Sequence, residues 1–551
     1  MTMTDILARP IGLLLAATAL IAAAPPAKHP ISAERLSADV KILASDEFQG
    51  RAPGTPGEAK TVEWLVARLK SLGLEPAAPG GTWTQAVPLI RTQLGAGTTA
   101  VVTPKGSRPL VMGRDIYAST IRAADRVAIA SAPMVFVGYG VDAPERNWDD
   151  FKGVDLKGKI AVMLVNDPDF EAAAGDDSKG KFGDRRMTFY GRWVYKYEEA
   201  ARRGAIGALI VHDTPGAGYG WDTVTAPRSE NYDIDGATGR LALQGWLHGD
   251  AATALFADAG QDLAALRRAS RRSDFKPVDL GSRFSANLPV TLTRVQSQNV
   301  LARLSGAKRP KEAVMFGAHW DAYGVGAADA RGKTIRPGAN DDALGVAGML
   351  EIARVMKAGP RPDRSILFGF WTAEERGLLG SEAYALKPSV PARDTVANIT
   401  LDILNTGGPS RDVMLVGAGQ NSLEADLGVA AKAQGRVVTP EALPERGLFY
   451  RADHFSLAKR GVPTLLLMAI SGAPDLIKGG RPAGQAWLDG YMKCYHQTCD
   501  EWSPALDFNG AADDVALALE VGRRAAKAGV WPSWSDESEF KTVRARDRGR
   551  K

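Results

Sequence analysis

The sequence predicts an α/β fold with a mixed, mostly parallel central sheet flanked by helices. Two short apolar runs bounded by glycine, residues 313–316 and 366–371, have the length and composition of buried strands. Between them, residues 345–357 place Ala, Val, Met, Leu and Ile at helical spacing. A strand, a helix and a strand in this order favour a βαβ unit, in which the two strands pair in parallel.

Imidazole and carboxylate side chains follow these predicted strands, at the edge where ligands bind in parallel sheets. One such group also precedes the helix, another follows the β-like run 399–401, and a second imidazole lies far downstream. We expect these groups to face one another in space. The proposed metal ligands are His319, Asp341, Glu375, Asp402 and His496.

Imidazoles and carboxylates without a thiol suit a hydrolytic divalent metal site. Five ligands give two ions three contacts each only if one carboxylate bridges them. Glu374 then remains beside the ions as a carboxylate that need not bind one, which is the position of a general base. We therefore expect two zinc ions per chain, with cobalt or manganese as substitutes that an oxygen-rich set also accepts.

Each motif alone has an ordinary structural interpretation as well. Adjacent glutamates often begin a solvated helix, where acids complement the helix dipole. Two aspartates before a helix are a common N-cap pattern, and His496 could be a hydrogen-bonded core histidine. The ordered combination is more specific, because the chain has only six histidines and two of them belong to this set.

The order His-x-Asp, Gly-Ala-x-Asp-Asp, Glu-Glu, Asp, His resembles the co-catalytic zinc exopeptidases of metallopeptidase family 28 over nearly the whole mature chain. The resemblance implies that Asp341 bridges the two zinc ions. His319 and Asp402 would complete one site, and Glu375 and His496 the other.

The same resemblance implies roles for the groups around the ligands. Glu374 would be the general base, and Asp321 would orient the imidazole of His319. The peptide bond after Asp341 is expected to be cis, as it often is in this family.

A downstream motif, Asp453-His454, resembles residues that line the substrate cleft of the family, and Tyr450 could donate to an oxyanion there. The alternative is that the motif is a structural capping loop before a helix over 455–460.

The expected activity is that of an aminopeptidase acting on peptides. The alternatives are a glutamate carboxypeptidase type, a glutaminyl-cyclase-like acyltransferase with one zinc, and a non-catalytic receptor-like relative.

Residues 1–27 have the pattern of a secretory signal, with Arg9 before an apolar stretch over 11–24 and alanines near the cleavage zone. The stretch is short for a membrane span, so we expect no stable membrane insertion after cleavage. An uncleaved anchor is the alternative. The sequence thus predicts an exported protein, periplasmic or extracellular.

The catalytic domain is predicted to consist of residues 31–110 and 281–535. Residues 111–280 hold β-rich runs and a segment, 153–159, similar to a protease-associated (PA) domain, so we expect an inserted lid or binding module. The pair His212-Asp213 within it is expected to be a loop pair. Residues 536–551 are expected to be a basic, flexible tail.

The net charge is +5, and much of it lies in that tail. No nucleic-acid motif accompanies the charge, so no nucleic-acid partner is expected.

The only two cysteines, Cys494 and Cys499, flank His496. An oxidising compartment permits a disulfide between them, and two buried thiols are the alternative. The sequence gives no indication of oligomeric state.

Overall fold

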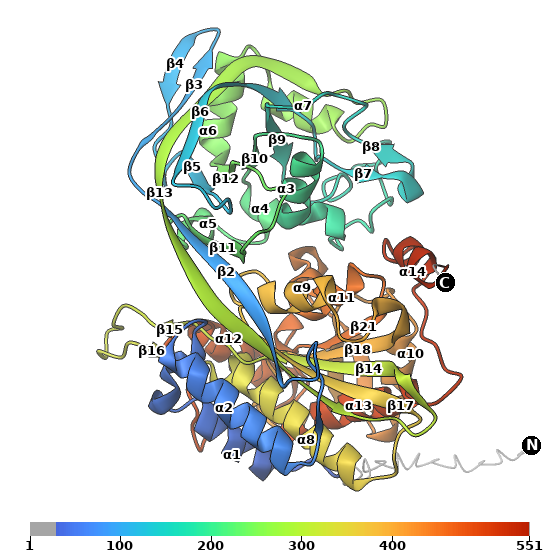
Figure 1. Cartoon of the computed structure of the whole chain (residues 1–551). Coiled ribbons are helices and arrows are strands. Elements are labelled where there is room, and N and C mark those ends of the chain that lie inside the picture. The colour runs from blue at the N-terminus through green and yellow to red at the C-terminus, as the bar shows by residue number, and fades with distance from the viewer. Residues whose placement is uncertain (1–28, 550–551) are drawn as a thin grey trace, which may run out of the picture.

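The computed structural model describes residues 29–549, and it forms two sheet-containing bodies, one above the other in Figure 1. The predicted signal segment, 1–27, lies outside the described residues. Within 29–549, no helix combines the length and apolar character that crossing a bilayer requires.

The lower body is built on a mixed sheet whose central strands are parallel. In spatial order these strands are β21 (Thr464–Leu467), β18 (Thr395–Leu401), β14 (Arg309–His319) and β17 (Arg364–Trp371). The long strand β13 (Val278–Leu304) then pairs antiparallel to β17. The predicted mixed, mostly parallel sheet is therefore confirmed, and β14 and β17 are the two strands of the predicted βαβ unit.

Helices cover both faces of this sheet (Figure 1). α1 (Ala33–Leu43), α8 (Leu344–Ala358) and α13 (Asn509–Ala525) pack together on one face. α9 (Leu379–Leu386) and α11 (His454–Ala458) pack together near β13, β18 and β21 on the other. The helix predicted over 345–357 is α8, which begins one residue earlier and ends one residue later.

Alternate side chains of β14 point into two separate cores. Val314 and Phe316 lie in the core that includes α1, α8 and α13, while Ala313 and Met315 lie in the core beneath α9. Because both faces of the strand are buried, its sequence is a continuous apolar run and lacks the alternation of a half-exposed strand.

The upper body has its own sheet and its own hydrophobic core. Its strands include β6 (Arg126–Phe136), β9 (Ile160–Leu164), β10 (Gly207–Val211), β12 (Leu243–Leu247) and β5 (Ile116–Ser119), which pair in parallel except for the β12–β5 pair. Its core draws on residues from Leu94 to Val290, a wider span than the predicted insert 111–280. The assignment of this body to the PA type stays a prediction.

Two strands connect the bodies. β13 contributes its first half to the upper sheet and its second half to the lower sheet, and β2 (Thr84–Leu94) pairs antiparallel with it. Figure 1 shows the two strands crossing together from one body to the other.

The upper body also contains the helices α6 (Gly249–Asp258) and α7 (Leu263–Ala269). The other helices are α2 (Pro56–Ser71), α3 (Trp193–Arg202), α4 (Thr214–Ala217), α5 (Trp221–Thr225), α10 (Leu423–Ala433), α12 (Gly480–Cys494) and α14 (Lys541–Gly549). The other strands are β1 (Glu75–Pro76), β3 (Thr98–Thr103), β4 (Gly106–Pro109), β7 (Asp142–Ala143), β8 (Trp148–Asp149), β11 (Glu230–Ile234), β15 (Gly324–Val325), β16 (Ile335–Arg336), β19 (Asp412–Leu415) and β20 (Val437–Pro440).

The prediction of a flexible tail over 536–551 is wrong for its described part. Residues 541–549 form α14, and Arg544 in this helix is buried. Its guanidinium donates to the carbonyl oxygens of Ala392 at 2.7 Å and Thr395 at 2.9 Å. In the sequence, Arg544 is one of the basic residues of the predicted tail, but in the structure it satisfies backbone acceptors before and at the start of β18.

We expect Arg544→Ala to lower the free energy of unfolding by about 1–3 kcal/mol, because two backbone acceptors lose a charged donor. Urea unfolding measures the difference. Arg546→Ala is the matched control, since Arg546 is exposed on the same helix and carries the same charge. Equal stability of the two variants would contradict the anchoring of this segment.

Candidate metal centre

The proposed ligands lie together at the carboxyl edge of the parallel strands. His319 ends β14, Glu374 and Glu375 follow β17, and Asp402 follows β18 directly. Asp341 lies in a turn, Ala339–Ala343, before α8, and its own backbone angles are not helical, while His496 follows α12. The strands end at one edge because they are parallel, so their following residues converge.

Asp341 lies between the two histidines. Its Oδ1 is 3.1 Å from His319 Nε2, and its Oδ2 is 3.2 Å from His496 Nε2. Each carboxylate oxygen therefore faces a different imidazole. A carboxylate in this position can contribute one oxygen to each of two cations.

Two groups of donor atoms converge around Asp341. The first consists of His319, Glu374 and Asp402, and the second of Asp341, Glu375 and His496. Within each group, the donor atoms lie within 4.8 Å of one another. In the second group, His496 Nε2 is 3.2 Å from Glu375 Oε2. The first group includes Glu374, the residue predicted to be the base.

Two donor atoms at the centre are buried and lack a hydrogen-bond partner among residues 29–549, namely His319 Nε2 and Asp402 Oδ1. They lie 3.9 Å apart. The 3.1 Å contact of His319 Nε2 with Asp341 does not have the direction of a hydrogen bond. Buried polar atoms are rarely left unpaired, so their arrangement fits a cation that would satisfy both.

The electrostatics of the centre also fit cations. Burial and neighbouring carboxylates raise the pKa of Asp402 to about 8 and hold the pKa of Glu374 and Glu375 well above the usual range. Burial opposes a charge on His319, but surrounding carboxylates, Glu374 foremost, raise its pKa well above the usual value. Carboxylates packed this closely stay ionised only beside positive charge.

Residues 299–519 match the family model described as Peptidase family M28. This segment contains β14, β17, β18 and every residue of the two donor groups. Residues 299–519 form a peptidase family M28 domain.

Two curated proteins match parts of the chain. Leupeptin-inactivating enzyme 1 of Streptomyces exfoliatus is 29% identical over 235 residues, which are 40% of this chain and 47% of that protein. The probable lipoprotein aminopeptidase LpqL of Mycobacterium tuberculosis is 28% identical over 28% of each chain. This chain therefore spans less than half the length of either relative.

Among solved structures, the chain is similar to an aminopeptidase from Aneurinibacillus sp. strain AM-1. The two share 21% identity with a TM-score of 0.48, over 91% of this chain and 96% of that chain.

Asp321 of the M28 domain connects the first histidine with the glutamate pair. Its backbone oxygen is 3.0 Å from His319 Nδ1, and its Oδ1 accepts the backbone N–H of Glu374 at 3.1 Å. The first contact leaves Nε2 directed toward the donor group. One residue thus fixes both the ring of His319 and the start of the Glu374 loop.

The peptide bond between Asp341 and Asp342 is cis, as the resemblance to family 28 implies. Asp500 supports this turn from the far end of the domain, because its carboxylate accepts the backbone N–H groups of Asn340 and Asp341 at 3.0 and 3.1 Å. Sequence reasoning missed Asp500, although it lies four residues after His496.

Arg51 is the other residue that sequence reasoning missed. It is fully buried, and its guanidinium donates to the backbone oxygens of Trp320, Pro337 and Gly338 at 2.6–2.9 Å. These carbonyls belong to the loops that follow His319 and precede the turn Ala339–Ala343. Gly338 adopts a φ of +57°, where a Cβ would also lie 3.1 Å from Arg51.

His496 is fixed by its neighbours in the chain. Cys494 and Cys499 form a disulfide, which closes a small loop around it. The imidazole also packs between aromatic rings, with ring centres 3.6 Å from Tyr495 and 4.4 Å from Tyr323. The loop and the rings together restrict the orientation of this ligand.

The three residues proposed to line the substrate cleft have different side-chain surroundings in the structure. The Tyr450 hydroxyl donates to Glu539 at 2.9 Å, so the prediction of an oxyanion donor is not supported by this placement. Burial lowers the pKa of His454 to about 3, so it is neutral, and its ring packs on Phe449. Burial raises the pKa of Asp453 to about 7, and His319 opposes the rise.

The pair His212-Asp213 of the upper body has local partners. His212 Nε2 is 3.0 Å from the Tyr219 backbone oxygen, and Asp213 pairs with Arg267 at 2.6 Å.

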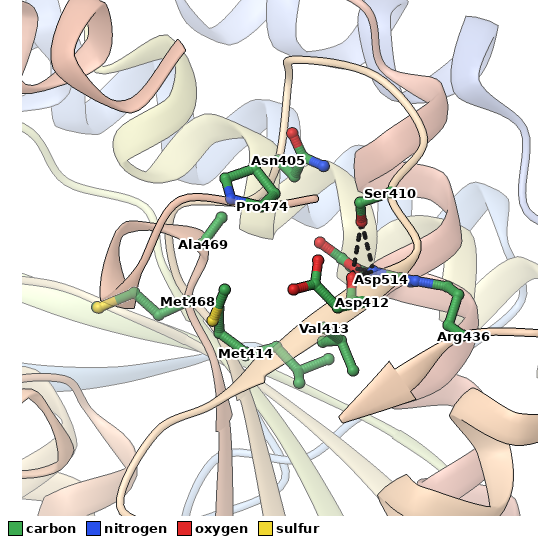
Figure 2. Close-up of a pocket in the computed structure, with 11 residues that line it drawn as sticks. Asn405, Ser410, Asp412, Val413, Met414, Arg436, Met468, Ala469, Pro474 and Asp514 are labelled. Carbon is green, nitrogen blue, oxygen red and sulfur yellow. Dashed lines mark hydrogen bonds and ion pairs between the residues drawn. The ribbon is translucent and has the colours of Figure 1, made fainter. Parts of the chain in front are cut away.

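A pocket away from the metal centre is shown in Figure 2. Its charged groups are already paired. Arg436 donates to Asp514 at 2.7 Å and to Ser410 at 3.0 Å, and Asp412 pairs with Arg481 at 2.8 Å. These pairs connect β19, α12, α13 and the residue before β20, which is a structural role.

A buried network supports the strand end before Glu374. Glu58 accepts from Ser297 Oγ at 3.0 Å, and Ser297 Oγ lies 2.5 Å from Thr372 Oγ1. Burial raises the pKa of Glu58 to about 7. Since the folded state holds this proton more tightly than the unfolded chain, Glu58 supports folding fully below pH about 4.5, and this support is lost as the pH rises to about 7.

We expect Glu58→Gln to remove about 2–3 kcal/mol of the decline in unfolding free energy between pH 5 and pH 8, because the amide stays neutral. Urea unfolding of both proteins at both pH values measures this. A decline of the same size in the two proteins would contradict the raised pKa of Glu58.

Proposed function

We propose that the chain is a zinc-dependent exopeptidase, most specifically an aminopeptidase that hydrolyses the amino-terminal peptide bond of peptides. The observation that carries the proposal is the placement of Asp341, with one carboxylate oxygen toward each histidine. The M28 match supports the class of enzyme. The name of the mycobacterial relative, a probable aminopeptidase, supports the direction of cleavage.

Two zinc ions would be held by the two donor groups. His319 and Asp402 would bind one, Glu375 and His496 the other, and Asp341 would bind both. When bound, zinc polarises a carbonyl group and lowers the pKa of water to about 7. The remaining steps belong to side chains of the protein.

Glu374 would be the general base. With Asp341, His319 and Asp402 assigned to one ion, the Glu374 carboxylate is free to take a proton from the attacking water. It would then give that proton to the leaving amine. Its Oε2 lies 4.0 Å from His319 Nε2, which is close enough to serve the same centre. Burial raises its pKa, which suits a group that must hold the proton between the two steps.

A carboxypeptidase is the second candidate, because Arg376 directly follows Glu375, packs on the Tyr323 ring and forms no ion pair with an acid within residues 29–549. Dipeptides blocked at either end separate the two activities. An aminopeptidase requires a free amino terminus, whereas a carboxypeptidase cleaves the amino-blocked substrate. Cleavage of amino-blocked dipeptides alone would overturn the proposed direction.

We expect Glu374→Gln to lower kcat by about 10²–10⁴-fold, because the amide keeps the shape of the side chain but cannot accept a proton. KM and zinc content should change little, since the lost interaction belongs to the transition state. Steady-state kinetics and metal analysis of the purified variant measure both quantities.

Glu375→Gln is the matched control for this experiment. It should hold less zinc than the wild type, for which we expect two ions per chain, because an amide is a poorer ligand than a carboxylate. If Glu374→Gln loses metal and Glu375→Gln does not, the two roles are exchanged. If both variants stay fully active, the proposed site is wrong.

We also propose that the protein is exported, on the basis of the signal pattern over 1–27. Mature protein from the native host should begin between Ala23 and Lys28, as determined by amino-terminal sequencing. Protein that begins at Met1 would contradict export with cleavage.

A further inference from the structure

The amino-terminal edge of the parallel sheet, opposite the metal centre, carries a concentration of positive charge. Here β14 begins at Arg309 and β17 at Arg364, and α13 ends two residues before Lys527. Figure 1 shows the segment that leads from α13 to α14 on the side of the lower body away from β15 and β16. The basic residues of this edge are Lys308, Arg309, Lys311, Arg364, Arg393, Lys527, Arg544 and Arg548.

The acids beside these cations are fewer, namely Glu312, Asp363, Asp394 and Asp547. Glu312 pairs with Arg309 at 2.9 Å and with Arg364 at 2.6 Å. Asp363 pairs with Lys308 at 2.9 Å. The acids that approach the strand starts are therefore already engaged and do not neutralise the other cations.

Three cations of the edge lack acidic partners. Lys311, Lys527 and Arg548 are exposed, and none of them forms an ion pair within residues 29–549. Burial and the charge of Arg548 lower the pKa of Arg544 to about 10. The positive charge outweighs the acids at this position, so the edge favours an anionic partner.

An apolar loop lies among these cations. Val530 is 39% exposed, and Trp531 beside it is half-buried. The guanidinium of Arg364 holds the loop, since Nη1 donates to the backbone oxygens of Lys527 at 2.7 Å and Val530 at 2.5 Å. The Trp531 ring centre lies 3.9 Å from the guanidinium carbon of Arg548 and 4.8 Å from that of Arg364. An exposed apolar side chain, a tryptophan and surrounding cations are the composition of a membrane-interface anchor.

We propose that this edge docks on a membrane that contains anionic lipids, with residues 530–531 entering the headgroup layer and Lys311, Lys527 and Arg548 beside lipid phosphates. Each basic residue near an anionic membrane surface strengthens binding about fivefold, and tryptophan prefers the interface. A soluble polyanion would pair with the cations but leave Val530 in water, so the apolar loop favours a membrane. Such docking is peripheral and needs no membrane-spanning helix.

The strand β14 sets the distance between the docking edge and the metal centre, because it runs from Arg309 to His319. A strand of this length spans roughly 30–35 Å. Docking would therefore leave the metal centre directed away from the membrane. The proposal does not depend on the proposed peptidase function, and changes at the edge should leave the hydrolysis of a soluble dipeptide unchanged.

Sedimentation of the mature protein with lipid vesicles tests the proposal. The wild type should bind vesicles of phosphatidylcholine mixed with an equal amount of phosphatidylglycerol at least about tenfold more tightly than vesicles of phosphatidylcholine alone. Lys311→Gln combined with Lys527→Gln should weaken binding to the mixed vesicles about 25-fold, because two charges are lost. Val530→Gln should weaken it about threefold or more, because the loop then brings a polar side chain into the headgroup layer.

Lys157→Gln combined with Lys276→Gln is the matched control. Both lysines are exposed in the upper body and form no ion pair among the described residues, so the same charge is removed away from the edge. This variant should bind the mixed vesicles as the wild type does. All the variants should keep the Tm of the wild type, so that a loss of binding reports the surface and not the fold.

Equal binding of the wild type to the two kinds of vesicle would overturn the proposal, as would an equal loss of binding in the control variant. Val530→Gln that binds as tightly as the wild type would overturn the entry of the loop into the headgroup layer. Soluble polyphosphate is the competing occupant. A wild type that binds polyphosphate but neither kind of vesicle would overturn membrane docking and assign the edge to a soluble polyanion.

Discussion

Mutual repulsion among buried carboxylates is the constraint on which the M28 domain depends. Asp341, Glu374, Glu375 and Asp402 approach one another at the end of the sheet, where little water reaches them. They are held there by strands whose two faces are both packed into cores, so the carboxylates cannot separate. The stability of the apolar sheet thus maintains an arrangement that is unfavourable until cations bind.

The loops between the strands and the ligands are fixed by polar groups that bind no metal. Arg51 donates to carbonyls on both sides of the centre, and Asp500 accepts the N–H groups of the turn that carries Asp341. These contacts satisfy backbone groups in loops that have no sheet or helix partners. They therefore orient the loops without occupying a ligand position.

The parts of the fold that could be predicted from sequence are those whose cause is local. β14, α8 and β17 were predictable because burial on both faces requires continuous apolar runs of strand length, separated by a helical pattern. The ligands were predictable because they follow those runs. Arg51, Asp500 and Arg544 were not predictable, because each acts on backbone carbonyls or N–H groups far away in the chain. Such acceptors have no sequence signature, so in sequence a buried anchor such as Arg544 cannot be distinguished from an exposed arginine of a flexible tail.

The continuous strand β13 links the upper body structurally to the metal centre. Its first half pairs with β6 in the upper sheet, and its second half pairs with β17 in the lower sheet. In that second half, Asn299 accepts the backbone N–H of Thr372 at 3.1 Å, and Ser297 contacts the Thr372 hydroxyl. Thr372 lies two residues before Glu374. The strand that carries the upper body therefore also supports the glutamate loop.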